Sequence, residues 1–238
     1  MEAGHVHMEI SPEAIDIPIE GSRLRGFVHR CGASNADGLV LTHGAGSDCQ
    51  SMLLRFLADA FVASGLTVLR CDLPFRQARP HGPPAKGGAE RDQNGLRAAV
   101  TFMRRETVGR IFLCGHSYGG RQASMLAARE PRLVEALLLL SYPLHPPRRL
   151  DELRIMHFSN LCTPAMFVHG TRDEFGSIAE MEAALALIPA RTELVPIPQV
   201  GHELITSRNR EVLAQHMAHG FMTFAHKAPW TEAGSAPH

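Results

Sequence analysis

Six short apolar runs, separated by segments of helical periodicity, constrain most strongly what this chain can fold into. Each run is apolar at nearly every position, and not only at every second one, which is typical of strands covered on both faces. Such strands belong to parallel sheets flanked by helices. The runs are GLVLT (38–42), LTVLRC (66–71), RIFLC (110–114), EALLLLS (135–141), PAMFVHG (164–170) and TELVPI (192–197).

Amphipathic segments lie between these runs. In the first of them, Leu53, Leu57 and Phe61 recur at helical spacing, so a helix there would present one apolar face to the sheet. Alternation of strand and helix predicts an α/β fold with right-handed crossovers. The expected helices cover 49–64, 93–106, 119–130, 177–188 and 205–225.

The N-terminal part has a different pattern. Residues 14–21 and 23–30 alternate in polarity around a Gly-Ser turn, which predicts an antiparallel hairpin at the edge of the sheet. With 238 residues, the chain fits one domain of the larger kind. We expect a single domain over 1–238 with an ordered core of about 20–225, and termini that are loose because the C-terminal APWTEAGSAPH is small and polar.

Composition bears on partners and location. The 24 basic and 24 acidic residues cancel, so charge indicates neither nucleic acid nor an anionic membrane as a partner. Five cysteines without a Cys-x-x-Cys pair indicate reduced thiols. The N-terminus lacks the features of a secretory signal, and the longest apolar stretch, 136–140, is too short to span a bilayer. We therefore expect a soluble cytoplasmic protein of unspecified oligomeric state.

The strongest chemical motif is Gly-His-Ser-Tyr-Gly at 115–119, between an apolar run and a small-residue helix. Two glycines let the backbone pack closely around a strained turn that lifts Ser117 clear of the sheet. The unpaired N–H groups of the following helix favour negative charge beside that serine. We interpret Ser117 as a nucleophile, the alternative being a structural turn with an idle serine.

A serine nucleophile needs a general base and a group that orients the base. Asp173 follows the run 164–170, and His202 follows the run 192–197, so both should lie at the carboxyl edge of the sheet, where open α/β sheets bind ligands. The chain order Ser117, Asp173, His202 is the one expected for this architecture. Glu174 is the rival of Asp173, and a satisfied surface histidine is the alternative for His202.

The segment LTHGAG (41–46) runs from a strand into a glycine-rich turn. Such a turn can aim a backbone N–H at the serine, so we assign the oxyanion hole to the N–H groups of Ala45 and Tyr118. The alternative is an ordinary strand-to-helix turn. His43, directly before the turn, is expected to support the loop.

LTHGAG, GHSYGG, HGTRDEFG and VGHEL, in this order, resemble the α/β-hydrolase superfamily over about residues 20–225. More narrowly, SYPLHPP (141–147), HGAG and GGR are similar to dienelactone-hydrolase-like or KANL3/Tex30-like predicted hydrolases. The resemblance implies an eight-strand, mostly parallel sheet, a Ser-His-Asp triad and no cofactor. His5 and His7 are the weak candidates for a metal site, which we do not predict.

Two segments should shape the site. Only 22 residues separate Ser141 from Pro164, enough for a minimal lid and a fairly open site. The basic loop 74–91 is either a rim that attracts an anionic substrate through residues such as Arg76 and Arg79, or a solvated loop.

Together these features predict a serine hydrolase of the carboxylic ester hydrolase class, which cleaves a small-molecule ester or thioester through an acyl-enzyme. A non-catalytic interaction protein on the same fold, and a peptidase or acyltransferase with the same triad, are the alternatives.

Overall fold

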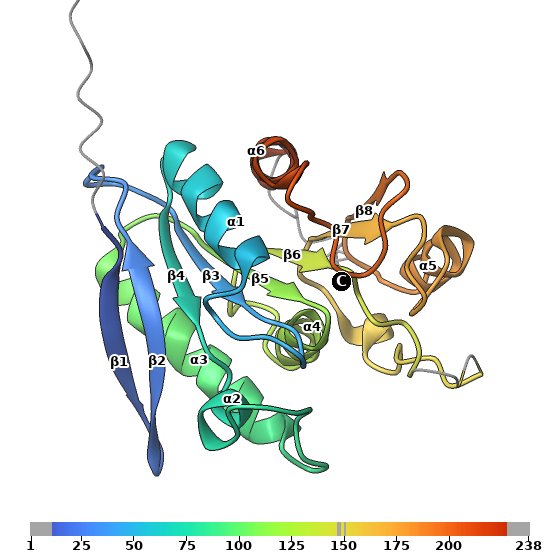
Figure 1. Cartoon of the computed structure of the whole chain (residues 1–238), viewed down its shortest axis with the longest axis horizontal. Coiled ribbons are helices and arrows are strands. Elements are labelled where there is room, and N and C mark those ends of the chain that lie inside the picture. The colour runs from blue at the N-terminus through green and yellow to red at the C-terminus, as the bar shows by residue number, and fades with distance from the viewer. Residues whose placement is uncertain (1–10, 147–148, 150, 228–238) are drawn as a thin grey trace, which may run out of the picture.

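All eight expected strands are present and form one sheet in the computed structural model, which describes residues 11–146, 149 and 151–227. The strand order is β1-β2-β4-β3-β5-β6-β7-β8 (Figure 1). β1 pairs antiparallel with β2 and β2 with β4, while all other pairs are parallel, so the edge hairpin and the mostly parallel sheet are confirmed. The strands are β1 (Glu13–Ile19), β2 (Ser22–His29), β3 (Gly38–Thr42), β4 (Thr67–Cys71), β5 (Ile111–His116), β6 (Ala136–Leu140), β7 (Ala165–Gly170) and β8 (Thr192–Ile197).

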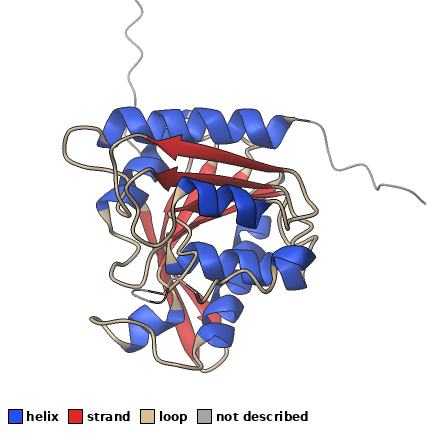
Figure 2. Cartoon of the chain, turned by 90° about the vertical axis from the view of Figure 1, so that its right-hand side faces the viewer, coloured by secondary structure: helices blue, strands red, loops and turns tan. Residues whose placement is uncertain are grey.

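Helices cover both faces of the sheet, as Figures 1 and 2 show. Alternate residues of the buried strands point to opposite cores: Leu137 and Leu139 face one side, whereas Leu138 and Leu140 face the other. The first core includes α3, α4 and α5, and the second includes α1 and α6. The helices are α1 (Met52–Ala63), α2 (Pro74–Ala78), α3 (Ala89–Glu106), α4 (Tyr118–Arg129), α5 (Ile178–Leu185), α6 (Arg210–His226) and the short 3₁₀ turn η1 (Phe158–Asn160).

Next to β3, the chain changes the side of the sheet on which successive strands are added. From β3 it passes through α1 to β4 on one side, and then crosses back to β5 on the other side. Ligand sites of open α/β sheets form at such switch points, outside the carboxyl ends of the strands. The loop after β3 and the turn after β5 therefore meet where a site is expected.

Several helix boundaries differ from the sequence expectation, most of all those of α3 and α6. α6 begins at Arg210 instead of 205, because Thr206 and Asn209 close a turn through their own side chains, with Thr206 Oγ1 donating to Asn209 Oδ1 at 3.0 Å. α2 was not expected, and it lies at the start of the basic loop 74–91 with Pro74 at its first turn. α3 then starts at Ala89, within the same loop.

Further expectations concern thiols, membranes and termini. All five cysteines are free, and Cys49, Cys71 and Cys114 are buried. In the described part of the chain, no helix combines the length and the apolarity that crossing a membrane requires. The expected fraying of 228–238 and the histidines His5 and His7 lie outside the described residues.

Candidate active site

Ser117 lies on a sharp turn between the end of β5 and the start of α4. Its φ of 50° and ψ of −115° are unusual for a residue with a side chain, which indicates local backbone strain. Glycines make the turn possible: a Cβ on Gly115 would collide with the backbone of Gly120, and one on Gly119 would lie 2.5 Å from the His43 carbonyl oxygen. The first turn of α4 thus packs against the start of the loop that follows β3.

The three residues expected from the motifs lie in one hydrogen-bonded chain. Ser117 Oγ is 2.7 Å from His202 Nε2, and His202 Nδ1 is 2.9 Å from Asp173 Oδ2 and 3.1 Å from Oδ1. In the matching tautomer, His202 donates from Nδ1 to the carboxylate and accepts the Ser117 hydroxyl proton at Nε2. The side chain of Asp173 is buried and that of His202 is 17% exposed. This geometry allows His202 to take a proton from Ser117.

Asp173 is held in its ionised form. Burial raises the pKa of its carboxyl, but the hydrogen bond from His202, the His202 charge and the Phe175 N–H outweigh burial and leave the pKa below its usual range. Phe175 N donates to Oδ1 at 2.9 Å, and the Phe175 ring packs on the His202 ring with 4.4 Å between centroids. The rival carboxylate, Glu174, is exposed to solvent.

The backbone of His202 is fixed by two residues that the sequence motifs did not single out. His116 Nε2 donates to the His202 carbonyl oxygen at 3.0 Å, and Ser141 Oγ donates to the same oxygen at 2.6 Å. Burial lowers the pKa of His116, which keeps its ring neutral. His116 occupies the first variable position of Gly-x-Ser-x-Gly, and Ser141 follows β6 with a φ of 46°. The hydrogen bond from Ser141 joins residues that are far apart in the chain, so no local sequence pattern reveals it.

The two N–H groups expected to form an oxyanion hole belong to the loop after β3 and to the start of α4. Gly44 lies against the turn, since a Cβ added to it would be 3.3 Å from Ser117 Cβ. Within the described residues, the N–H groups of Ala45 and Tyr118 donate no hydrogen bond. Tyr118 is the first residue of α4, so its N–H belongs to the unpaired donors of a helix start. The Tyr118 N–H, next to Ser117 in the chain, is therefore free to donate to a negatively charged oxygen.

Two buried side chains, His43 and Arg76, hold the loop after β3. His43 bridges its own loop and the start of α2: its Nδ1 contacts the Gly44 carbonyl at 2.8 Å, and its Nε2 accepts from Leu73 N at 2.9 Å. Burial lowers the pKa of His43, in accord with a neutral ring. His43 thus supports the loop, as the sequence indicates.

Arg76 corrects the expectation for the basic loop. Its side chain is buried, and its guanidinium donates to five backbone carbonyls. It is therefore engaged inside the protein and is not an exposed rim group, whereas Arg79, Lys86 and Arg91 are exposed. The carbonyl partners of Arg76 are those of Ala45, Ser47, Arg79, Pro80 and Gly82.

Tyr118 has a buried anchor. Its hydroxyl donates to Asp92 Oδ2 at 2.7 Å, and Asp92 Oδ1 accepts from Phe75 N at 2.9 Å. Burial raises the pKa of Asp92. The ring of Phe75 packs edge-on against Tyr118 at 5.4 Å. This contact ties the first residue of α4 to α2 and α3.

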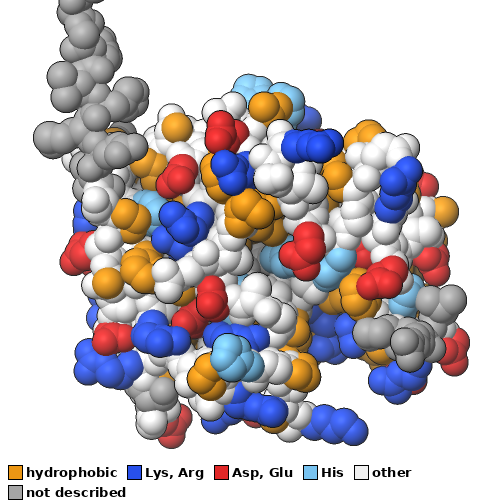
Figure 3. Space-filling view, in the orientation of Figure 1, with side chains coloured by type: hydrophobic (Ala, Val, Ile, Leu, Met, Phe, Trp, Pro, Cys, Tyr) orange, Lys and Arg blue, Asp and Glu red, His pale blue; other side chains and the backbone are white. Residues whose placement is uncertain are grey.

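The site opens to solvent near His202. A hollow of about 540 Å³ is lined by residues 174–175 and 199–206, which include His202. Figure 3 shows histidine side chains near the centre of this face of the molecule. In the described residues, no group of three or more His, Cys, Asp or Glu side chains could hold a metal ion.

A model of a known protein family matches most of the chain. A family model described as "Alpha/beta hydrolase domain" covers residues 35–227. Among curated proteins, a 2-hydroxy-6-oxononadienedioate/2-hydroxy-6-oxononatrienedioate hydrolase from Pseudomonas sp. is 28% identical over 127 residues. That match covers 52% of this chain and only 43% of the relative.

Solved structures share the fold. Dienelactone hydrolase from Anabaena variabilis superposes with a TM-score of 0.72 at 21% identity, and covers 89% of this chain and 97% of its own. Est1E from Butyrivibrio proteoclasticus, solved with bound ferulic acid, has a TM-score of 0.76 at 17% identity, with 90% and 100% covered. At these identities the likeness concerns the fold.

Proposed function

Because the chain belongs to the α/β-hydrolase family, we propose that it is a serine hydrolase that cleaves a carboxylic ester or thioester through an acyl-enzyme. The observation that carries the proposal is the unbroken hydrogen-bonded chain from Ser117 through His202 to Asp173. Its nucleophile lies on a strained turn at the switch point of the sheet. A serine hydroxyl is activated as a nucleophile when it is hydrogen-bonded to a histidine and an ionised carboxylate is hydrogen-bonded to the other nitrogen of that histidine.

The first half-reaction forms the acyl-enzyme. Ser117 Oγ attacks the carbonyl carbon while His202 Nε2 takes the hydroxyl proton, and the carbonyl oxygen becomes an oxyanion. The N–H groups of Ala45 and Tyr118 hold that oxyanion. Asp173 orients His202 and stabilises its positive charge. His202 then gives the proton to the departing alkoxide or thiolate.

The second half-reaction releases the acid. Water enters from the open side near His202, loses a proton to Nε2, and attacks the acyl carbon. The same two N–H groups hold the second oxyanion. When it collapses, the Ser117 oxygen leaves and recovers its proton from His202, so the enzyme returns to its starting state.

Fold neighbours and cysteines support further parts of the proposal. One neighbour is a dienelactone hydrolase and another has been solved with ferulic acid, which favours small-molecule acyl substrates. The free cysteines favour a reducing compartment such as the cytoplasm. We propose no cofactor.

Hydrolysis of matched substrates tests the proposal. Wild-type protein and Ser117→Ala are compared on 4-nitrophenyl butyrate, its thioester analogue and the corresponding anilide, with and without an added alcohol acceptor. We expect ester and thioester cleavage by the wild type and loss of that activity in Ser117→Ala. Cleavage of the anilide faster than the ester would indicate a peptidase. Transfer of the acyl group to the alcohol in preference to water would indicate an acyltransferase. No turnover by a folded wild type would contradict the proposal.

A further inference from the structure

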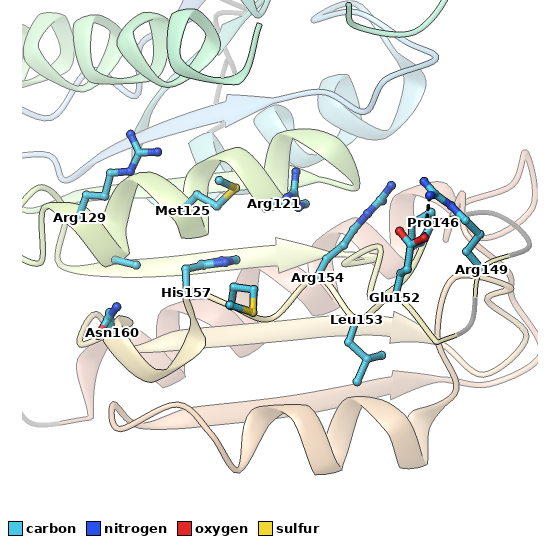
Figure 4. Close-up of a pocket in the computed structure, with 12 residues that line it drawn as sticks. Arg121, Met125, Arg129, Pro146, Arg149, Glu152, Leu153, Arg154, His157 and Asn160 are labelled. Carbon is cyan, nitrogen blue, oxygen red and sulfur yellow. Dashed lines mark hydrogen bonds and ion pairs between the residues drawn. The ribbon is translucent and has the colours of Figure 1, made fainter. Parts of the chain in front are cut away.

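A second pocket lies along α4, away from the hollow at His202. It has a volume of about 570 Å³, in the range of ligand pockets in proteins. One wall is α4, and the other is the segment between β6 and β7 (Figure 4). Met125, Ala128 and Leu153 supply apolar surface. The pocket can therefore enclose an organic group as well as an ion.

The polar lining carries an excess of positive charge. Four arginines line the pocket with one glutamate: Arg121, Arg129, Arg149 and Arg154 against Glu152. Glu152 forms an ion pair with Arg149 at 2.7 Å, so its negative charge is engaged by Arg149 and does not pair with the other three arginines. The remaining titratable group, His157, is neutral because burial and then the charge of Arg121 lower its pKa to about 4.

Among the described residues, Arg121, Arg129 and Arg154 have no acidic partner. Of these three, Arg121 and Arg154 are half-buried and Arg129 is exposed. Arg121 Nε is buried and has no hydrogen-bond acceptor among the described residues. Burial, followed by the charge of Arg121, lowers the pKa of Arg154. In Figure 4 Arg121 lies near the middle of the pocket, with Arg154 on one side of it and Arg129 and Asn160 on the other. Two partly desolvated guanidinium groups near each other favour a bound anion.

The pocket and the nucleophile share helix α4, which lines the pocket with Arg121 and Met125 and begins next to Ser117. Tyr118, Arg121 and Met125 are three or four residues apart and so share this face, and all three are half-buried. Ser117 is the N-cap of the same helix. A helix rises 1.5 Å per residue, so Arg121 lies roughly 6 Å along the axis from Ser117.

We propose that this pocket is a subsite for an anionic group of the substrate, a carboxylate or a phosphate, held by Arg121 and Arg154 about one helical turn from Ser117. The proposal rests on the serine hydrolase function proposed above and names its substrate class. Guanidinium groups suit the role, because each can donate two parallel hydrogen bonds to a carboxylate or a phosphate. The apolar wall would contact the chain between the anion and the ester.

Two pairs of esters test the subsite. One pair is mono(4-nitrophenyl) adipate and 4-nitrophenyl hexanoate, which differ in a terminal carboxylate on the acyl side. The other pair carries the carboxylate, or a hydrogen in its place, on the alcohol side. We expect Arg121→Gln and Arg154→Gln to lower kcat/KM for the anionic member of at least one pair by roughly ten- to hundredfold. The neutral member should be hydrolysed at the wild-type rate.

Matched variants separate the subsite from general charge and from folding. Arg105→Gln removes the same charge from an exposed position on α3 and should leave both members of each pair unchanged. Arg154→Lys keeps the charge but not the paired donors, so its loss should be intermediate. Unchanged hydrolysis of the neutral esters shows that each variant is folded. Equal effects on the anionic and neutral members of both pairs would overturn the proposal.

A binding measurement is independent of catalysis. Adipate and inorganic phosphate are titrated by calorimetry into Ser117→Ala, with and without Arg121→Gln and Arg154→Gln. Binding of either anion that is lost with both arginine substitutions supports the subsite, even if the wild type hydrolyses no ester, and the preferred anion identifies the group. No binding of either anion, together with no preference among esters, would overturn it.

Discussion

Asp173 and Glu174 are adjacent carboxylates, of which only Asp173 contacts His202. The Asp173 carboxylate sets the tautomer of the ring, so an amide in its place can donate to Nδ1 and favours the wrong tautomer. We expect Asp173→Asn to lower kcat about a thousand- to ten-thousandfold while the protein stays folded. Glu174→Gln is the matched control and should hydrolyse esters like the wild type. Equal losses in the two variants, measured on 4-nitrophenyl butyrate, would mean that Asp173 does not orient His202.

Arg76 is a positioning residue for the loop that carries Ala45. Its guanidinium joins this loop to the carbonyls after α2, and no shorter side chain can reach all of them. We expect Arg76→Gln to lower kcat by about ten- to hundredfold with little change in KM, because a displaced oxyanion donor weakens transition-state binding. Arg79→Gln, which changes an exposed neighbour, is the control. A rise in KM at unchanged kcat would instead place Arg76 in substrate binding.

Local motifs predict some of these residues and not others. Ser117, Asp173 and His202 each follow an apolar strand, so their place at the sheet edge can be read from the sequence. The roles of Arg76, His116 and Ser141 depend on backbone carbonyls that are remote in the chain. Such contacts leave no periodic signal. For the same reason, the sequence of loop 74–91 left open an anion-binding rim or a solvated loop, and neither alternative foresaw that Arg76 is engaged with the backbone.

At the scale of elements, strands are predicted more accurately than helix starts. A strand buried on both faces is apolar throughout, as in β6, so its ends are marked by the first polar residues. A helix start depends on which side chain caps it. Ser51 caps α1 by accepting from Leu54 N, which places its start at Met52 and not at 49. Ser177 and Glu180 form a capping box on α5, which begins at Ile178, one residue after the expected start.

The contact between α4 and the loop after β3 makes a prediction at this scale. In Gly119→Ala, the added methyl would lie 2.5 Å from the His43 carbonyl oxygen, so α4 and the loop must move apart. We expect ester hydrolysis to fall by about a hundredfold or more, because Tyr118 and Ala45 then separate. The control variant is Gly220→Ala within α6, where the added methyl meets only the flexible end of the Met166 side chain, and it should keep its ester hydrolysis. Full activity of Gly119→Ala would show that the two N–H groups need no fixed spacing.

For the whole molecule, buried histidines determine how stability depends on pH. Burial first, and nearby arginines second, lower the pKa of His29 and His157 to about 4, below about 6.5 for the unfolded chain. Between these values the unfolded chain binds more protons, so stability present above pH 6.5 is lost as the pH falls toward 4. Asp92, whose pKa burial raises, opposes this loss, and Asp173 adds to it only at lower pH.

Urea unfolding measures this dependence. We expect the free energy of unfolding to be about 2 to 4 kcal/mol lower at pH 5.0 than at pH 7.5, since each histidine contributes up to about 1.4 kcal/mol per pH unit. His29→Asn keeps an acceptor for Arg70 but does not titrate, so it should flatten the dependence. Equal stability of the wild type at both pH values would contradict burial of these histidines in neutral form.

The central claim is that Ser117 is an activated nucleophile, and labelling with a fluorophosphonate tests it most directly. Intact mass is recorded for the wild type, Ser117→Ala and His202→Asn after equal exposure to the reagent. We predict one adduct on the wild type, none on Ser117→Ala, and at least a hundredfold slower labelling of His202→Asn. A folded wild type without an adduct, or an adduct that persists in Ser117→Ala, would contradict the account.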